Sequence, residues 1–509
     1  MWFVVWLACS PAPVPDATFV RGAVVVSAAG EGREVGGGRS LVSVDWKPGD
    51  VKFGATAPER PECVALFSVP LGDVTAAIAA GAEPPDTALA FSPDGSRVAI
   101  GAYTGEVVIA DGFTGAVIAR RVLPEALAKR VAWSPDGAVL YVGDQSPDAR
   151  LYALDGATLA DRWVVALAED VGHSPAPAGD DVYGVYQLPG VFGLVVAPDG
   201  DVLAVAVHGW NDPALGYRNA SRVYRFAPDG ARRAAWPADG VADATLMTLA
   251  WDGPGGALAV PVGRSAAGPA PVDLPVGGVL VLDAATLVPR ATFALEPLRP
   301  WFDRVFVWDA LGVSVARDRV VAGTGDGRVR AWRLADGSVA ADLAPGVPVD
   351  AGGVPLAASV GFAAIVGDEV LALTSGTSIP FGAADPALRP PRAHPGENTI
   401  GAWSTEGEVR WTFQGPERLA GLAVSPDGSA LVAGAGLREA DERTDLFGAL
   451  VFRLGGVGSG AERLVTTCPT EGPVFFRMAV ADDGRIAVAE HPLKHGDVVT
   501  GTYRVTVLR

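Results

Sequence analysis

Residue types that bind metals are sparse in this chain. Glu490, His491 and His495 lie close together, and such a group binds zinc when a helix brings the side chains to one face. Pro492 stands inside the group and disfavours that helix. We therefore expect these residues to lie in a solvated loop that binds no metal.

A second acidic group offers oxygen ligands of the kind that Ca²⁺ prefers, at Asp441, Glu442 and Asp445. We interpret it as ordinary surface charge. The sequence contains no Gly-x-Ser-x-Gly elbow, no His-Glu-x-x-His motif and no Walker loop. With only five histidines, a general base would have to be a carboxylate, and no carboxylate is singled out by its neighbours. We expect no enzyme, no cofactor and no metal site.

Composition indicates a large core built from strands. Of 509 residues, 64 are glycine and 41 are proline, and both residue types weaken the interiors of helices. Apolar residues make up 49% and charged residues 19%, so the chain is not disordered in the polar, highly charged manner. The formal net charge of −18, without a basic stripe, argues against nucleic acid as a partner.

One phrase, an apolar strand followed by Pro-Asp-Gly and a second apolar strand, occurs four times. It is centred on Pro93-Asp94-Gly95, Pro135-Asp136-Gly137, Pro198-Asp199-Gly200 and Pro426-Asp427-Gly428. Proline presets φ, aspartate bonds its own backbone, and glycine tolerates positive φ, so the phrase predicts a hairpin turn. A third strand, a second tight turn and a fourth strand follow. The repeating unit is therefore a four-stranded antiparallel meander.

Nine such units can be placed along the chain. They cover 41–80, 87–122, 130–166, 192–236, 246–294, 304–344, 355–414, 418–466 and 473–509. The first is degenerate and the last has three strands, so we assign the missing outer strand to residues 18–27. Isolated meanders expose both faces, and radial stacking buries them. We predict an all-β fold, a single β-propeller of eight or nine four-stranded antiparallel blades, closed by an N-terminal strand that joins the C-terminal blade.

The Ser-Pro-Asp-Gly phrase followed by an apolar strand resembles the WD40-like and YVTN-type propeller repeats of bacterial envelope proteins. The resemblance covers nearly the whole chain after Thr18 and is specific for fold rather than function. The Gly-His and Trp-Asp pairs of eukaryotic WD40 repeats are not repeated in register here. The resemblance implies a scaffold whose relatives mostly bind other macromolecules.

The N-terminus suggests an export signal. An apolar run ends at Trp6-Leu7-Ala8-Cys9, which resembles a bacterial lipobox, although no Lys or Arg precedes the run and Trp6 replaces the usual leucine. A misassigned start codon would explain both departures. We expect a signal peptide at 1–8, lipidation of Cys9, a linker at 9–17 and the propeller at 18–509. Lipid would hold the protein on the outer membrane or its periplasmic face without a transmembrane segment.

Two further cysteines, Cys63 and Cys468, lie near opposite ends of the chain. In an oxidising compartment they can form a disulfide, and two buried free thiols are an equally open alternative. The bridge would close a very long loop, for which chain-entropy models predict a large stabilisation.

The extra length of the repeats is concentrated in the connections that leave one end of each meander. These insertions span 169–189, 208–220, 264–276, 296–308, 376–398, 436–447 and 491–500. Aromatic and arginine side chains in them are the types that dominate protein interfaces. The binding residues that we predict are Trp210, Tyr217, Arg218, Trp301, Phe302, Arg304 and Arg392.

These observations favour a non-catalytic recognition or scaffold lipoprotein of the bacterial cell envelope. We expect a monomer that binds a protein or a glycan through its loop-rich face. The alternative is a quinoprotein-like or calcium-dependent propeller enzyme, because Asp111-Gly112-Phe113-Thr114-Gly115 looks like part of a quinoprotein tryptophan-docking turn. Only Trp163 and Trp411 stand where that family repeats a tryptophan. A third hypothesis is an assembly role similar to that of propellers in outer-membrane machinery.

Overall fold

The chain forms two compact units that consist almost entirely of β-strands. Unit 1 comprises Met1–Phe53, Gly209–Ser221 and Asp239–Gln414, and unit 2 comprises Gly54–His208, Arg222–Ala238 and Gly415–Arg509. The computed structural model describes residues 18–20, 24–26, 63–80, 86–174, 188–212, 216–253, 256–263, 274–275, 277–295, 300–301, 304–305, 310–316, 318–325, 327–345, 349–350, 355–375, 394, 396–414, 418–436, 447–455, 459–495 and 497–509. Within these residues, no helix is long and apolar enough to cross a membrane.

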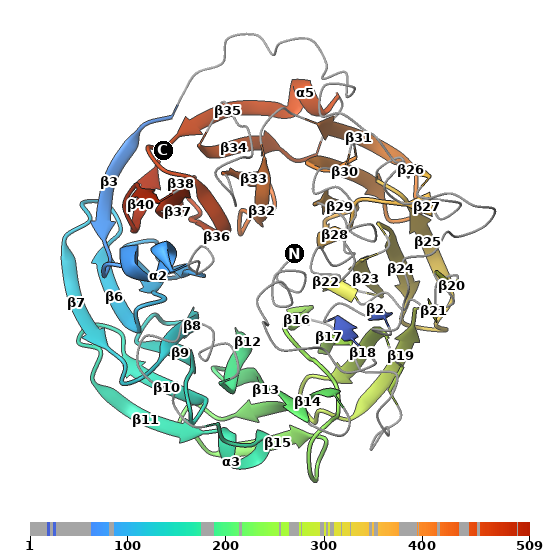
Figure 1. Ribbon diagram of the computed structural model, residues 1–509, viewed down its shortest axis with the longest axis horizontal. Coiled ribbons are helices and arrows are strands. Elements are labelled where there is room, and N and C mark those ends of the chain that lie inside the picture. The colour runs from blue at the N-terminus through green and yellow to red at the C-terminus, as the bar shows by residue number, and fades with distance from the viewer. Residues whose placement is uncertain are drawn as a thin grey trace. The chain divides into compact units, whose positions relative to one another are not determined.

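Unit 2 contains most of the four-stranded antiparallel sheets, and nearly all join strands that are consecutive in the chain (Figure 1). The strands are β4 (Ala88–Phe91), β5 (Arg97–Gly101), β6 (Glu106–Asp111), β7 (Val117–Val122); β8 (Leu127–Trp133), β9 (Val139–Gln145), β10 (Arg150–Asp155), β11 (Asp161–Ala166); β12 (Gly190–Val196), β13 (Val202–Asp212), β14 (Gly216–Phe226), β15 (Arg232–Trp236); β32 (Leu419–Val424), β33 (Ala430–Ala435), β34 (Gly448–Arg453) and β35 (Leu464–Pro469). A single pairing, Gly190 with Gln145, also links β12 to β9. The outer halves of β13 and β14 are grouped with unit 1.

One sheet of unit 2 combines the two ends of the described chain. It has the order β3 (Ala65–Pro70), β40 (Arg504–Leu508), β37 (Ile486–Glu490) and β36 (Val474–Val480). Three of its strands are C-terminal, and β3 is the outer strand that the C-terminal segment lacks.

Unit 1 contains three more sheets of the same kind. Their strands are β16 (Ala250–Trp251), β17 (Ala257–Gly263), β18 (Gly277–Asp283), β19 (Pro289–Ala294); β22 (Ala310–Ala316), β23 (Arg319–Thr324), β24 (Val329–Arg333), β25 (Val339–Leu343); β28 (Val360–Val366), β29 (Glu369–Thr374), β30 (Thr399–Ser404) and β31 (Val409–Gln414). The described residues of both units thus hold eight four-stranded units.

Small elements decorate the connections between these strands. They are the hairpins of β1 (Thr18–Val20) with β2 (Val24–Val26), β20 (Pro300–Trp301) with β21 (Arg304–Val305), β26 (Val349–Asp350) with β27 (Pro355–Leu356) and β38 (Leu493–His495) with β39 (Val498–Thr500), and the helices α2 (Thr75–Ala79), α3 (Ala168–Val171) and α5 (Gly460–Arg463).

The predicted hairpin phrase forms the turn between the first and second strands of its sheets. At the first copy, Asp94 Oδ1 accepts hydrogen bonds from Ser92 Oγ (2.6 Å) and Ser96 N (3.0 Å), and Gly95 N donates to Ser92 O. The Ser92 hydroxyl is the largest cause of a pKa near 2 for Asp94. Gly95 has φ of 66°, which explains why glycine follows aspartate in the phrase. The sequence interpretation of this turn is confirmed.

The hydrophobic core lies between neighbouring sheets. One cluster joins Ile109 of the β4–β7 sheet with Leu140 and Tyr152 of the β8–β11 sheet. Another joins Val98 of the β4–β7 sheet with Val507 of the sheet that contains β3. In unit 2 the first strands β32, β36, β4, β8 and β12 are also successive neighbours. Within unit 2, neighbouring meanders therefore bury their faces against each other, as repeat stacking requires.

The prediction that an N-terminal strand joins the C-terminal sheet is correct, but the residues that we assigned to this strand are wrong. An N-terminal strand does complete the C-terminal sheet, but it is β3, whose Ala65 pairs with Leu508 of β40. The segment that we assigned to this role, 18–27, instead folds back on itself, because Thr18 pairs with Val26. The unit predicted at 41–80 is accordingly not a separate blade where it is described, because β3 belongs to the last sheet.

Connection lengths are strongly unequal at the two ends of these sheets. Connections from the first to the second strand are tight throughout, as are those from the third to the fourth, except for the segment that carries α5. The long connections follow the second strand or link one sheet to the next. They include 167–189, 264–276, 295–309, 375–398 and 436–447. In an antiparallel meander, these two classes of connection leave opposite ends of the sheet, so each sheet has a tight end and a long-loop end.

Candidate functional site

The predicted binding residues of the β13–β14 hairpin have different environments. Trp210 is half-buried near the end of β13, and Tyr217 lies near the start of β14. Arg218 forms an ion pair with Asp243, and their side chains are 15% and 10% exposed. The Arg218 guanidinium therefore fixes its own segment, which disfavours the predicted role in partner binding.

Two further predicted residues, Trp301 and Arg304, lie opposite each other in the short β20–β21 hairpin. Their backbones are thus held together in one connection between sheets of unit 1. Phe302, Arg392 and the predicted lipidation site Cys9 lie outside the described residues. The acidic group at 441, 442 and 445 also lies outside them.

Cys63 and Cys468 are joined in a disulfide, with Cα atoms 4.8 Å apart. Cys468 is buried on β35, and Cys63 lies two residues before the start of β3. The bridge therefore ties the segment that leads into β3 to the neighbouring sheet of unit 2.

The expected solvated loop around Glu490 and His491 is instead buried, with each residue 1% exposed. Glu490 accepts hydrogen bonds from Arg504 Nε (2.9 Å) and Gly472 N (2.7 Å). Burial lowers the pKa of His491 to about 4, although its hydrogen bond with Pro492 O opposes the shift. Glu490 serves as the ionic partner of Arg504. Among the described residues, no group of three or more His, Cys, Asp or Glu side chains is arranged to bind a metal.

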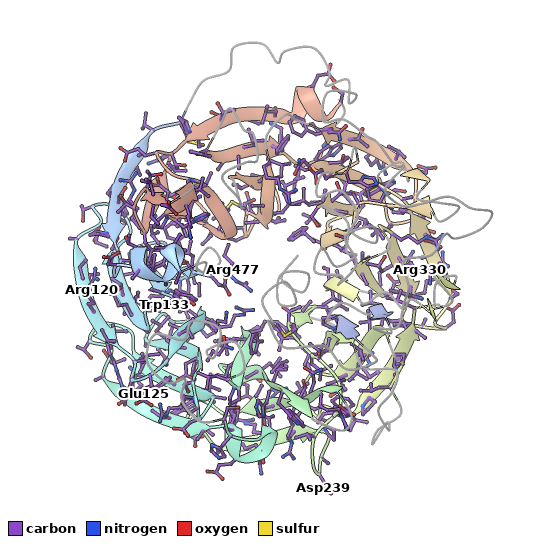
Figure 2. All side chains as sticks on the ribbon, in the orientation of Figure 1. Arg120, Glu125, Trp133, Asp239, Arg330 and Arg477 are labelled. Atoms are coloured by element: carbon purple, nitrogen blue, oxygen red, sulfur yellow. A yellow bond between two sulfur atoms is a disulfide. The ribbon has the colours of Figure 1, made fainter. Side chains whose placement is uncertain are left out.

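Three cationic side chains surround one buried carboxylate in unit 2. Asp86, which precedes β4, is 4% exposed. Its Oδ2 lies 3.7 Å from Lys129 Nζ and 3.3 Å from Arg130 Nη1, and its Oδ1 lies 3.5 Å from Arg477 Nε. We call these four residues the Asp86 cluster; Figure 2 labels Arg477 on β36.

Irregular strand pairing places the cations. The register of β8 against β9 shifts between Ala128 and Arg130, so Lys129 is the extra residue of a β-bulge. The register of β36 against β37 shifts between Val474 and Met478, around Arg477. Bulges redirect side chains and often border binding sites.

The first strands of other sheets carry the same irregularity with uncharged residues. The extra residues there are Phe192 in β12, Leu311 in β22, Gly361 in β28 and Ala420 in β32. The bulge is thus a property of the repeat, whereas a charged bulge occurs in two first strands, β8 and β36, which are both neighbours of β4. This difference separates the Asp86 cluster from the general architecture.

The charged groups of the Asp86 cluster shift one another's pKa values. Burial favours neutral Asp86, but Lys129, Arg477 and Arg130 outweigh it and hold the pKa of Asp86 below its usual range. Burial lowers the pKa of Lys129 to about 8, against the attraction of Asp86, with Arg130 and Arg477 adding to the lowering. At neutral pH the cluster therefore contains an ionised carboxylate and a largely protonated lysine.

The cluster was missed by sequence analysis. Lys129 and Arg130 stand in an ordinary apolar strand, and Arg477 is far along the chain. The one available signal was the lysine itself, since the chain has only four lysines and Lys129 stands in an apolar stretch.

A separate buried carboxyl group, Asp144 on β9, gives a pH-dependent prediction. Burial raises its pKa to about 7, against hydrogen bonds from Ser146 Oγ (2.9 Å) and Arg150 N (2.6 Å). Because the folded pKa exceeds the unfolded value of about 3.9, this group stabilises the fold fully below pH ~4 and loses that contribution as pH rises towards ~7. We expect Asp144→Asn to remove a stability slope of up to about 1.4 kcal/mol per pH unit in this window. Urea unfolding across the window measures it; equal slopes for both proteins would contradict it.

Comparisons with known proteins identify the fold. No family model and no curated protein matches the chain. Among solved structures, the C-terminal WD40 domain of Sif2 is similar over 89% of this chain and 99% of that one, with 12% identity and a TM-score of 0.51. The computationally designed Ika8 protein matches over 88% and 99%, with 14% identity and a TM-score of 0.51. BamB from Moraxella catarrhalis matches over 88% and 98%, with 16% identity and a TM-score of 0.48.

These similarities agree with the series of four-stranded antiparallel sheets and with the repeated turn phrase. At such low identity they establish the fold alone. The chain has the fold of a WD40-like β-propeller.

Proposed function

We propose that the protein is a non-catalytic recognition or scaffold module of the bacterial cell envelope, which binds a protein or a glycan. The observation that carries this proposal is the unequal length of the connections at the two ends of the sheets. Tight turns such as 92–96 and 112–116 occupy one end, and long connections such as 264–276 and 375–398 leave the other. Concentrating variable segments at one end is how a repeat scaffold forms a binding surface.

The disulfide supports the proposed location. Stable disulfides persist in oxidising compartments such as the periplasm and are rare in the cytosol. The Cys63–Cys468 bridge is therefore the expected chemistry for an exported protein. The signal peptide at 1–8 and lipidation of Cys9 complete the proposal as the means of export and anchoring.

The test is loss of partner binding without loss of stability. We expect simultaneous replacement of Trp210, Tyr217 and Trp301 by alanine to weaken capture of a partner from the membrane fraction by about tenfold or more, because aromatic residues dominate interface energetics. The melting temperature should change little if these rings lie outside the core. Capture is measured by cross-linking and mass spectrometry, with the melting temperature recorded on the same sample.

A matched control changes exposed apolar residues at the tight ends of unit 1. Val288 and Val339 are 59% and 54% exposed, next to the turns that precede β19 and β25. The Val288→Ser, Val339→Ser variant should keep full partner capture. Unchanged capture by the aromatic variant, or a large fall in its melting temperature, would oppose the proposed binding surface.

A further inference from the structure

One sheet of unit 2 is completed by a strand that no turn connects to it. β3 pairs with β40, whose Thr506 lies 438 positions after Ser68 of β3. Most other outer strands of the described sheets follow their inner neighbours through short turns, such as residues 112–116 before β7 and 284–288 before β19. A strand held by such a turn completes its own sheet. β3 is not held in this way, so a β3 strand from a second copy of the chain could fill its place.

β3 is less buried than the two strands that follow it in the sheet order. Four of its six residues are exposed, and Val69 alone is buried. In β40 four of the five residues are buried, and in β37 all five are buried. Release of β3 therefore uncovers part of the core cluster that contains Val69 but leaves β40 paired with β37. Such an opening is local, because it does not require the inner strands to unfold.

The contacts that position β3 do not require it to come from the same chain. Its ladder begins with Ala65 opposite Leu508, and at its other end Pro70 O accepts a hydrogen bond from Arg120 Nη2 (2.9 Å). Neither contact involves the connection from β3 to β4, residues 71–87. That connection can span up to about 55–60 Å when fully extended. A β3 strand from a second copy can therefore make the same contacts.

The disulfide secures β3 without specifying which chain supplies the strand. Cys63, which precedes β3, is bonded to Cys468 on β35, and their Cα atoms are 4.8 Å apart. Cys63 N also donates to Thr467 O (3.0 Å). A β3 strand from a second copy, paired in the same register, brings its own Cys63 to the same place. Oxidation then locks whichever strand is present.

We propose that two copies of this chain exchange β3, so that β3 of each copy pairs with β40 of the other. Each Cys63 then forms its disulfide with Cys468 of the other copy. Exchange of an identical element is a low-cost route to dimers, and reciprocal exchange closes at two chains. Each bridge forms from two thiols while one disulfide oxidant, such as oxidised glutathione, is reduced to two thiols. The proposal does not depend on the partner binding proposed above.

Protein concentration decides between the closed monomer and the exchanged dimer. Both forms contain the same strand pairs and the same bridges, so they differ mainly in whether β3 is supplied within the chain or from outside it. A group on a short flexible connection has an effective concentration in the millimolar range. We therefore expect on the order of a tenth of the chains in dimers at about 100 µM protein, and well under about 1% at about 1 µM.

The experiment refolds equal amounts of isotopically heavy and light full-length chains together. Both carry Cys9→Ala, so that Cys63 and Cys468 supply the only thiols. The reduced, unfolded mixture is refolded in a glutathione redox buffer at the two concentrations, and mass spectrometry identifies the peptide pairs that the bridge joins. Pairs with one heavy and one light half arise only between chains, and we expect them in the dimer fraction at about 100 µM. Their absence there, or their presence only in larger aggregates, would overturn the proposal.

Single-cysteine variants test the exchange without unfolding the protein. In the Cys9→Ala chain, Cys63→Ala keeps Cys468 and Cys468→Ala keeps Cys63, so neither variant has a bridge of its own. When the two folded variants are mixed under oxidising conditions, we expect a covalent dimer that contains one of each. The control replaces the Cys468→Ala chain by one that carries Val339→Cys and neither Cys63 nor Cys468, because Val339 is 54% exposed and a thiol there reports random collisions. An equal yield of dimer with the control, or no dimer from the pair, would refute the exchange.

Discussion

Replacing Cys63 and Cys468 together by alanine is expected to lower the free energy of unfolding by about 4–5 kcal/mol. The two residues are separated by 405 positions, so the bridge removes a large amount of conformational entropy from the unfolded chain. The effect should appear in urea unfolding of the double variant compared with the oxidised native protein. It would exceed the change caused by most single core substitutions.

The loss should begin at β3. Cys63 N donates to Thr467 O (3.0 Å), and Val64 and Arg509 exchange backbone hydrogen bonds just before β3 pairs with β40. Because β3 is an outer strand, a single ladder pairs it with its own sheet, and the bridge ties the segment before it to the neighbouring sheet. Hydrogen exchange should therefore show lower protection of β3 amides in the double variant before other strands are affected.

A reducing agent provides the control for this prediction. It should destabilise the native protein by a similar amount and leave the double variant unchanged, since that variant has no bridge to reduce. Equal unfolding midpoints of the native protein and the double variant would show that strand pairing alone secures the ends of unit 2.

The fold was predictable because its signals are local. The Pro-Asp-Gly phrase needs only five or so neighbouring residues to form its turn, and the hydrogen bonds of Ser92 and Asp94 confirm that interpretation. Four strands between successive phrases then predict the meander. Nothing beyond the turn and the alternation of apolar residues is needed for this step.

The choice of closing strand was not predictable in the same way. Residues 18–27 and Ala65–Pro70 are both apolar stretches that precede the first complete unit. What distinguishes them is a set of distant contacts, including the pairing with β40 and a hydrogen bond between the Ser68 and Thr506 hydroxyl groups (2.8 Å). Propensity does not encode contacts between residues so far apart in the chain.

The Asp86 cluster was hidden for a related reason. Its members come from the segment before β4 and from β8 and β36, and they meet because first strands of successive sheets are neighbours in unit 2. The binding residues predicted from sequence lie in the long connections, and those connections contain none of the four residues of the cluster. The position of the bulges, which depends on strand pairing, decides where the charges point.

Arginine contacts between sheets were also absent from the sequence interpretation. Arg97, at the start of β5, donates to Gly137 O (2.9 Å) and Gly156 O (2.6 Å), which lie in the two tight turns of the β8–β11 sheet. Arg485, just before β37, donates in the same way to Gly95 O (2.8 Å) and Gly112 O in the two tight turns of the β4–β7 sheet. An arginine immediately after the first turn thus ties one sheet to the next.

The turn that receives Arg485 has no room for a side chain at Gly112. A Cβ added to Gly112 would lie 2.6 Å from Gly95 O and 2.9 Å from Arg485 Nη1. Glycine is therefore required at this position by close approach of the backbone and the guanidinium. The same turn presents Phe113, whose ring centroid lies 3.8 Å from Arg485 Cζ.

Arg485→Ala is accordingly expected to lower the free energy of unfolding by about 3–5 kcal/mol, because two hydrogen bonds from a charged donor are lost and each contributes about 1.5–3 kcal/mol. Arg485 is 1% exposed, and its loss leaves two carbonyl groups without their donors and Asp483 without its ion pair. Arg485→Lys should recover less than half of this loss, because an ammonium group cannot span both turns in the plane of the guanidinium. Urea unfolding and hydrogen exchange of β4 and β37 amides measure the effect.

The matched control is Arg232→Ala, which removes an arginine that is 51% exposed and lies 3.1 Å from Asp170. Exposed ion pairs contribute about 0–1 kcal/mol, so this variant should unfold close to the native midpoint. If Arg485→Ala behaved like Arg232→Ala, the buried arginine would be dispensable and apolar packing alone would join the sheets. If Arg485→Lys restored full stability, a single positive charge would be sufficient. The simultaneous hydrogen bonds of one guanidinium group to both turns would then add nothing to the free energy of unfolding.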